Sequence, residues 1–296
     1  MEQPYIRGVY NKQPGKPSIT PPFLQRIFLV LAAALLAVSR LDAATFVVSN
    51  TADSGPGALR QTILDANTSG GGAIVFSNVT GIITLASPLP VITANVTITG
   101  PGTNLLTISG HSQFSIFAMT AGTTNTLSHL TIADGWKVSS GMTRSTASGI
   151  SYAGSLKVLN CNLLKCQDYA TFGGAVYNSG SLEMQSCLIA DSGSEMSNDD
   201  VDGGAIYNTG NLSLKTCTIS NCLAATGGAI YNDGNSFLTN CVIEACANDY
   251  GQGDGAGIYN HSGNFTLVAC SVTACDAGWW GGGIASWGNL TMTNTT

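Results

Sequence analysis

The chain has 296 residues, of which 9% are charged, 44% are hydrophobic and 36 are glycine. Its formal net charge of −6 disfavours nucleic acids and anionic membrane surfaces as binding partners. The apolar content is ample for a packed core, which argues against an intrinsically disordered chain.

The first 44 residues are predicted to be a leader and signal peptide. Arg26 precedes an apolar run over residues 27–38, which has the length of a signal-peptide core and is too short for an ordinary membrane span. Cleavage is expected near Ala44, and the alternative is an uncleaved anchor helix. The mature chain would hold 15 acidic and six basic residues, a net charge of −9, and no membrane span.

Residues 45–110 are expected to form an N-terminal cap and the first coils of a stack of strands. Residues 45–49 should be a strand, and residues 58–67 should be a helix because Leu59, Ile63 and Leu64 have helical spacing. A helix over the open end of such a stack would block pairing at its edge. Further short strands are predicted at 74–76, 82–85, 96–98 and 105–108.

From residue 111 to residue 296 the chain repeats one phrase six times. Its clearest form, Gly-Gly-Ala-Ile-Tyr-Asn, occurs at 203–208 and 227–232, and the spacings between copies run from 24 to 30 residues. Such a period is typical of a repeat architecture. Each unit fits three short strands, one ending at Ile206 and others at 212–214 and 217–219, followed by a variable loop. We therefore predict a parallel β-helix with coils about 4.8 Å apart, whose last coil is incomplete.

Positions that recur in every coil should stack into columns along the axis. The glycine pair suits a corner that needs positive φ or close backbone approach. The apolar column should fill the core, stacked Asn amides can bond to each other, and the Tyr column should point outward. These columns are Ile150, Val176, Ile206, Ile230, Ile258 and Ile284; Asn178, Asn208, Asn232 and Asn260; and Tyr177, Tyr207, Tyr231 and Tyr259.

Nine cysteines form two further columns. One contains Cys161, Cys187, Cys217, Cys241 and Cys270, and the other contains Cys166, Cys222, Cys246 and Cys275, with Ser192 in the gap. The sequence favours buried free thiols. Disulfides between neighbouring coils are the alternative, because the strand spacing suits them and an exported chain permits them. No metal site is predicted, because the spacing matches no zinc pattern.

Function is expected in the variable loop, which separates the last strand of one coil from the glycine pair of the next. Its versions are 167–172, 193–202, 223–226, 247–254 and 276–280. Asp202, Thr226, Asp254 and Trp280 precede successive glycine pairs and should share an edge. The candidate ligand-binding residues are Asp199, Asp200, Asp202, Asp249, Asp254, Trp279, Trp280, Tyr177, Tyr207, Tyr231 and Tyr259.

These residue types suit two ligands and also have purely structural explanations. Carboxylates suit calcium, the one cofactor that the loops suggest, and exposed aromatic rings can stack on a sugar. Alternatively, the loops are solvated turns that are rich in Asp for conformational reasons. The tyrosines would then stack only on each other across neighbouring strands.

The Gly-Gly-Ala-Ile repeats, followed by strands such as 212–214, resemble secreted bacterial right-handed parallel β-helix proteins with the pectin-lyase-like fold. They resemble in particular the polymorphic outer-membrane protein repeat class, which pairs this phrase with Phe-x-x-Asn. Phe237-Leu238-Thr239-Asn240 matches this second phrase in sequence but lies one strand earlier in its coil. Residues 51–67 look like the N-terminal cap of such proteins. The resemblance implies an all-β solenoid with a short capping helix, at the bacterial surface, in the outer membrane or secreted.

The expected role is an adhesive or structural scaffold that binds glycans or proteins without catalysis. The alternative is a carbohydrate-active enzyme of the same fold, either a polysaccharide lyase or a glycoside hydrolase. A lyase needs a base beside its acidic residues, and the acidic loops contain no Lys or Arg. A glycosidase needs two carboxyl groups roughly 5–9.5 Å apart. Asp202 and Asp254, two coils apart at about 9.6 Å, lie at that limit, so no catalytic residue is predicted.

Overall fold

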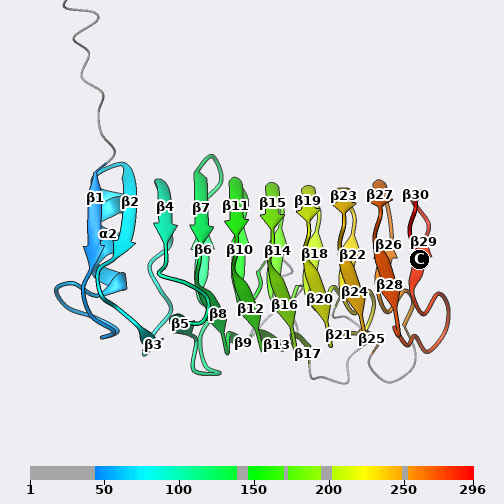
Figure 1. The fold of residues 1–296 in the computed structure, drawn as a ribbon, viewed down its shortest axis with the longest axis horizontal. Coiled ribbons are helices and arrows are strands. Elements are labelled where there is room, and N and C mark those ends of the chain that lie inside the picture. Colours follow the sequence, from blue (N-terminus) through cyan, green and yellow to red (C-terminus); the bar gives the residue numbers. More distant parts are fainter. Residues whose placement is uncertain (1–43, 139–145, 170–172, 195–201, 249–252) are drawn as a thin grey trace, which may run out of the picture. The chain divides into compact units, whose positions relative to one another are not determined.

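The predicted parallel β-helix is confirmed in the computed structural model, which describes residues 44–138, 146–169, 173–194, 202–248 and 253–296. The described residues belong to one unit, Ala43–Thr296. Their strands pair in parallel and stack along one axis, as Figure 1 shows. Nearly all of the predicted leader lies outside the described residues. Within them, no helix is long and apolar enough to span a membrane.

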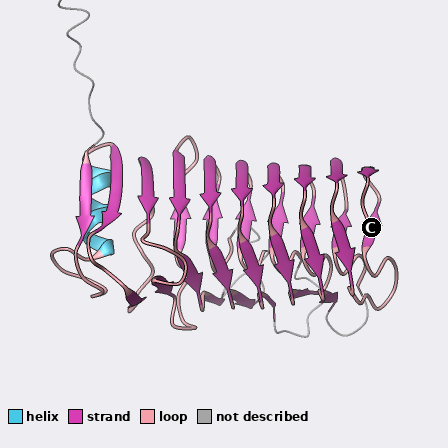
Figure 2. Ribbon diagram, in the orientation of Figure 1, coloured by secondary structure: helices cyan, strands magenta, loops and turns pink. Residues whose placement is uncertain are grey.

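The predicted capping helix is also confirmed. The helix α2 (Leu59–Thr68) lies against the first two strands, β1 (Thr45–Val48) and β2 (Gly71–Phe76), as Figure 2 shows. It buries Leu59, Ile63 and Ala66 against the core. Arg60 on the same helix reaches back to the preceding turn, where its Nη2 bonds to Asp53 Oδ1 at 2.6 Å. The helix therefore closes the N-terminal end of the core.

The longest strands form a ten-stranded sheet with two to three inward side chains in most strands. Leu156, Leu182 and Leu212 occupy one inward column of this sheet, and their partners in register confirm the predicted stacking. The strands are β1 (Thr45–Val48), β2 (Gly71–Phe76), β4 (Asn95–Thr99), β7 (Thr124–Ser128), β11 (Ser155–Leu159), β15 (Ser181–Gln185), β19 (Asn211–Lys215), β23 (Asn235–Thr239), β27 (Asn264–Val268) and β30 (Asn289–Thr293).

Two further sheets form walls of the core. An eight-stranded sheet contains β3 (Gly81–Thr84), β5 (Leu106–Ser109), β8 (Thr131–Ala133), β12 (Asn162–Leu164), β16 (Leu188–Ala190), β20 (Thr218–Ser220), β24 (Val242–Glu244) and β28 (Ser271–Thr273). A seven-stranded sheet carries the repeated phrase and contains β6 (Phe117–Met119), β10 (Ile150–Tyr152), β14 (Val176–Asn178), β18 (Ile206–Asn208), β22 (Ile230–Asn232), β26 (Ile258–Asn260) and β29 (Ile284–Ser286).

Two details of the predicted coil are wrong. Ile206 begins its strand instead of ending it, and Asn208 is the last residue of that strand. A fourth, five-stranded sheet begins with β9 (Trp136–Val138) and continues into the first residues of four predicted variable loops, as β13 (Gln167–Tyr169), β17 (Gly193–Ser194), β21 (Leu223–Ala224) and β25 (Ala247–Asn248). Strands of two or three residues are too short to give a recognisable alternation of apolar and polar residues.

The predicted core columns are confirmed residue by residue. Ile150, Val176, Ile206, Ile230 and Ile258 are in register and fully buried, and Ile284 is half-buried at the end of the column. Both cysteine columns exist as well. All nine cysteines are free thiols, and all but the half-buried Cys275 are buried. The structure thus agrees with the favoured prediction of buried free thiols.

Candidate functional site

The tyrosine column lies outside the main core and forms a stack of its own. The ring centroids of Tyr177 and Tyr207 are 5.8 Å apart, those of Tyr207 and Tyr231 are 4.8 Å apart, and both pairs are nearly parallel. Tyr259 follows at 5.3 Å with a tilted ring. Neighbouring rings therefore cover the faces of Tyr207 and Tyr231, whose exposed fractions are only 9% and 8%. The column ends there, because Ala285 is the next residue in register.

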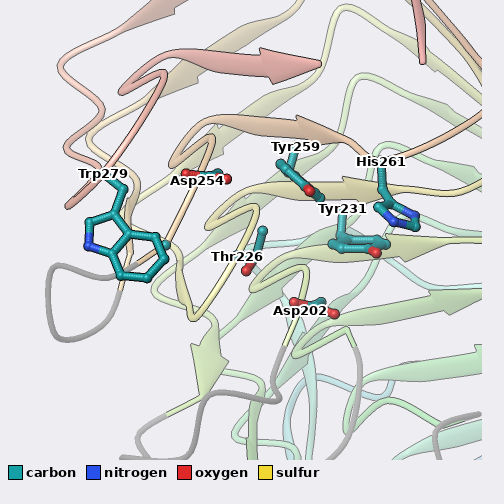
Figure 3. A pocket seen from close by; sticks show the side chains of 8 residues that line it. Asp202, Thr226, Tyr231, Asp254, Tyr259, His261 and Trp279 are labelled. Carbon is teal, nitrogen blue, oxygen red and sulfur yellow. The ribbon is translucent and has the colours of Figure 1, made fainter. Parts of the chain in front are cut away.

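A groove of about 430 Å³ lies beside this column. This volume is within the usual range of small-molecule sites, roughly 300–1,000 Å³. The groove is lined by Asp202, Thr226, Tyr231, Gly253, Asp254, Tyr259, His261 and Trp279, and Figure 3 shows their side chains. It thus combines aromatic rings, hydroxyl groups and carboxylates from four successive coils.

The predicted edge of residues that precede the glycine pairs is confirmed. Asp202 and Thr226 form a parallel β-bridge, and Gly227 N donates to Asp254 O at 3.2 Å. Gly255 N likewise donates to Trp280 O at 2.9 Å. These backbone bonds place one such residue from each coil at the same corner. Asp202 and Asp254 therefore line the same groove although 51 residues lie between them in the chain.

The glycine pairs make this corner sterically feasible. Gly203 and Gly227 have φ values of 71° and 63°, in the left-handed region that favours glycine. At the second position, a Cβ on Gly204 would lie 2.3 Å from Gly228 O. Because glycine meets both requirements, the chain can turn sharply between the acidic corner and the tyrosine strand.

His261, which lines the groove, forms a pair with Asp233 that was not predicted from the sequence. His261 Nδ1 lies 2.6 Å from Asp233 Oδ1, and the His261 ring stacks on Tyr231 and Tyr259 with centroids 5.8 Å and 5.9 Å away. Asp233 directly follows Asn232, and His261 directly follows Asn260. These two members of the Asn column are partners in adjacent coils. That shared position in the repeat is a signal from which the pair could have been predicted.

The electrostatic surroundings of the groove are acidic. Burial, together with the charges of Asp202 and Asp233, raises the pKa of Tyr231 above its ordinary value. Burial and the nearby Asp254 raise the pKa of Tyr259 in the same way. Both phenols therefore stay protonated and can donate hydrogen bonds at neutral pH. Among the described residues, Asp254 Oδ1 is a buried atom without a hydrogen-bond partner.

A second pocket of about 320 Å³ shares Asp254 with this groove. Its wall includes the exposed rings of Trp280 and Trp287, and the remaining lining comes from Gly281, Ile284, Ala285 and Ser286. Trp287 was not among the predicted site residues, because it follows β29 and lies outside the variable loops. The two pockets extend the candidate surface along the axis of the solenoid.

The predicted site residues divide into three groups. Asp202, Asp254, Tyr231, Tyr259 and Trp279 line the groove, and Trp280 lines the second pocket. Tyr177 and Tyr207 belong to the tyrosine column but line neither pocket. Asp199, Asp200 and Asp249 lie outside the described residues.

No cluster of three His, Cys, Asp or Glu residues with the geometry of a metal site occurs in the part of the chain that the structure describes. Calcium binding therefore stays a hypothesis that rests on residue types alone.

Comparison with known proteins identifies the architecture. Residues 149–296, half of the chain, match the family model of the right-handed β-helix region. A search of curated proteins found no match. The resemblance to the polymorphic outer-membrane repeat class stays a prediction.

Proposed function

The chain belongs to the right-handed β-helix family, and from this premise we propose that it is an exported scaffold that binds a glycan without turning it over. The observation that carries this proposal is the groove of about 430 Å³ beside the tyrosine column. Trp279 offers an exposed ring that can pack against the carbon face of a sugar. The carboxylates of Asp202 and Asp254 can accept hydrogen bonds from sugar hydroxyl groups.

The cellular location is part of the proposal. The apolar run at 27–38 supports export, and the repeated phrase supports display at a bacterial surface, because it resembles polymorphic outer-membrane proteins. An adhesin would use the rigid stack of coils to hold its groove away from the surface that carries it. A protein ligand with exposed sugar chains would satisfy the same groove.

Binding of the full chain to a panel of immobilised glycans tests the proposal. We expect retention on at least one glycan, and we expect Trp279→Ala to weaken it about tenfold, which corresponds to about 1.4 kcal/mol. Phe237→Ala is the matched control, because Phe237 is also an exposed aromatic residue but lies outside both pockets. Failure of the wild-type chain to bind any glycan would contradict the proposal.

One observation favours the alternative, a carbohydrate-active enzyme. The His261–Asp233 pair leaves the second ring nitrogen of His261 available for proton transfer, in the same groove as Asp202 and Asp254. An enzyme would release reducing or unsaturated ends from a polysaccharide panel tested with and without calcium. It would lose that activity in His261→Ala, Asp202→Ala and Asp254→Ala. Binding without any product supports the scaffold instead.

A further inference from the structure

We infer that the groove selects glycans that carry protonated amines, with the ammonium group of a hexosamine unit against the carboxylate of Asp254. This inference rests on the proposed function and names the ligand class of the same site. It is carried by the charges around the groove, by one buried oxygen atom and by the aromatic rings nearby.

The charges favour a cation. Asp202 and Asp254 line the groove, Asp233 adjoins it through His261, and no Lys or Arg occurs among its lining residues. His261 is engaged by Asp233 at 2.6 Å. An acidic surface attracts cationic ligands and repels anionic ones. Polymers of uronic acids are therefore disfavoured, and amine-bearing polymers are favoured.

The buried oxygen atom shows that the protein compensates the charge of Asp254 incompletely. Asp254 Oδ1 has no hydrogen-bond partner among the described residues, although it is buried. A buried acceptor without a partner is energetically unfavourable, and a carboxylate forms its strongest hydrogen bonds with charged donors. A primary ammonium group brings three donors and a full positive charge. Placed in the groove that Asp254 lines, it would offset the carboxylate charge that the protein leaves uncompensated, which a neutral hydroxyl group would do less well.

The aromatic rings distinguish an ammonium group on a sugar from a bare metal ion. Trp279, whose ring is exposed, lines the same groove as Asp254, and so does Tyr259. Aromatic rings attract ammonium groups and pack against the carbon skeleton that carries them. A metal ion needs several oxygen ligands at once, and the described residues provide no cluster suited to one.

The ligand is inferred to be an oligomer, because Asp254 lies on the wall that two pockets share. The second pocket, of about 320 Å³, has Trp280 and Trp287 in its lining. A hexosamine unit at Asp254 would place the next unit of the chain beside one of these two rings. A single amino sugar would leave that pocket empty and should bind more weakly than an oligomer.

Calorimetric titration of the full chain with three oligomers of equal length tests the inference. The probes are a β-1,4-linked glucosamine oligomer, its N-acetylated counterpart and a β-1,4-linked glucose oligomer, at a pH where the glucosamine amines are protonated. We expect the glucosamine oligomer to bind at least tenfold more tightly than the other two. This preference should fall in high salt, because screening weakens exposed charge interactions.

Asp254→Asn should remove most of the preference while keeping the shape of the groove. Asp191→Asn is the matched control, because Asp191 is an exposed carboxylate outside both pockets. Equal or tighter binding of the glucose or N-acetylated oligomer by the wild-type chain would overturn the inference and leave the proposed function intact. If no glycan binds, the proposed function fails as well. The wild-type comparison decides the question even if Asp254→Asn does not fold.

Discussion

Three of the four asparagines in the Asn column donate a side-chain N–H to the next one along the axis. The Nδ2 to Oδ1 distances are 2.6 Å from Asn178 to Asn208, 2.7 Å from Asn208 to Asn232 and 2.8 Å from Asn232 to Asn260. All four residues are fully buried. The hydroxyl of Tyr152 donates to the amide at one end of the row, and Ser286 Oγ accepts from the other end. The row thus satisfies polar groups that would be costly inside a core.

Removing one amide from this row should destabilise the protein. Asn208→Ala leaves Asn178 Nδ2 and Asn232 Oδ1 without that partner, so we expect the free energy of unfolding to fall by about 1–3 kcal/mol. Urea unfolding followed by circular dichroism measures the change. Asn235→Ala is the matched control, because Asn235 belongs to a similar but exposed row, with Asn211 and Asn264 as partners. Equal losses in the two variants would contradict the argument.

A serine in the core is also explained by this row. Ser236 takes the inward position that Leu212 holds in the preceding coil, yet it is only 5% exposed. Its hydroxyl donates to Asn232 Oδ1 at 2.7 Å. Ser236 thus joins the hydrogen-bonded row of asparagines at this coil. The buried polar side chain is tolerated because its donor has a partner.

At the scale of elements, Arg60 attaches α2 both to the turn before it and to the loop at residues 87–88 after it. Arg60 Nη2 contacts Asp53 Oδ1 at 2.6 Å and Ser87 O at 2.7 Å, and its Nη1 contacts Pro88 O at 2.6 Å. Burial by itself would raise the pKa of Asp53, but the hydrogen bonds from Arg60 and the Ala86 amide lower it below its ordinary value. The contribution of this carboxylate is therefore present at neutral pH and is lost as the pH falls through its folded pKa.

Loss of Arg60 should loosen the cap. Arg60→Ala removes hydrogen bonds from a charged donor to Asp53 and to two carbonyl groups, so we expect a loss of about 1.5–3 kcal/mol. Hydrogen exchange should rise first in the amides of α2. Lys157→Ala is the control, because the Lys157–Glu183 pair at 2.9 Å is about half exposed and should contribute at most about 1 kcal/mol. Unchanged exchange in α2 of Arg60→Ala would refute this role.

At the scale of the whole solenoid, the cysteine columns contribute a pH dependence. Burial raises the pKa of Cys161 to about 11 and the pKa of Cys166 to about 12. An unfolded chain exposes its thiols, whose ordinary pKa is about 8.5. The folded pKa of these thiols is therefore higher than their unfolded pKa. Burial of the neutral thiols stabilises the fold fully at pH values below the unfolded pKa of about 8.5. This stabilisation is lost as the pH rises toward 11 and 12.

Under reducing conditions we therefore expect the melting temperature to fall steadily between about pH 9 and pH 11. Ionisation of buried tyrosines should also lower the melting temperature as the pH rises, because burial raises the pKa of Tyr152 and Tyr231 as well. Cys166→Ser should make the decline shallower. Serine already occupies this column at Ser192, which is buried and bonds to Ala190 O at 3.0 Å. A melting temperature that is constant up to pH 11 would contradict the buried neutral thiols.

The sequence by itself determined the solenoid and the columns within it. A unit of 24 to 30 residues that cannot bury its apolar face alone must stack on its neighbours. In-register stacking then places equal positions of the repeat side by side, so the Ile, Asn, Tyr and Cys columns were predictable without coordinates. The edge that carries Asp202 and Asp254 followed from the same rule.

Only the tertiary structure decided what surrounds those columns. The fourth sheet is formed by backbone pairing over two or three residues, which leaves no pattern in the side chains. The groove exists because a sharp corner brings the acidic edge beside Tyr231, Tyr259 and Trp279. The pairing of His261 with Asp233 depends on the directions of two side chains in adjacent coils. A repeat fixes which residues are neighbours along the axis, but the turns between strands fix which side chains meet across a corner.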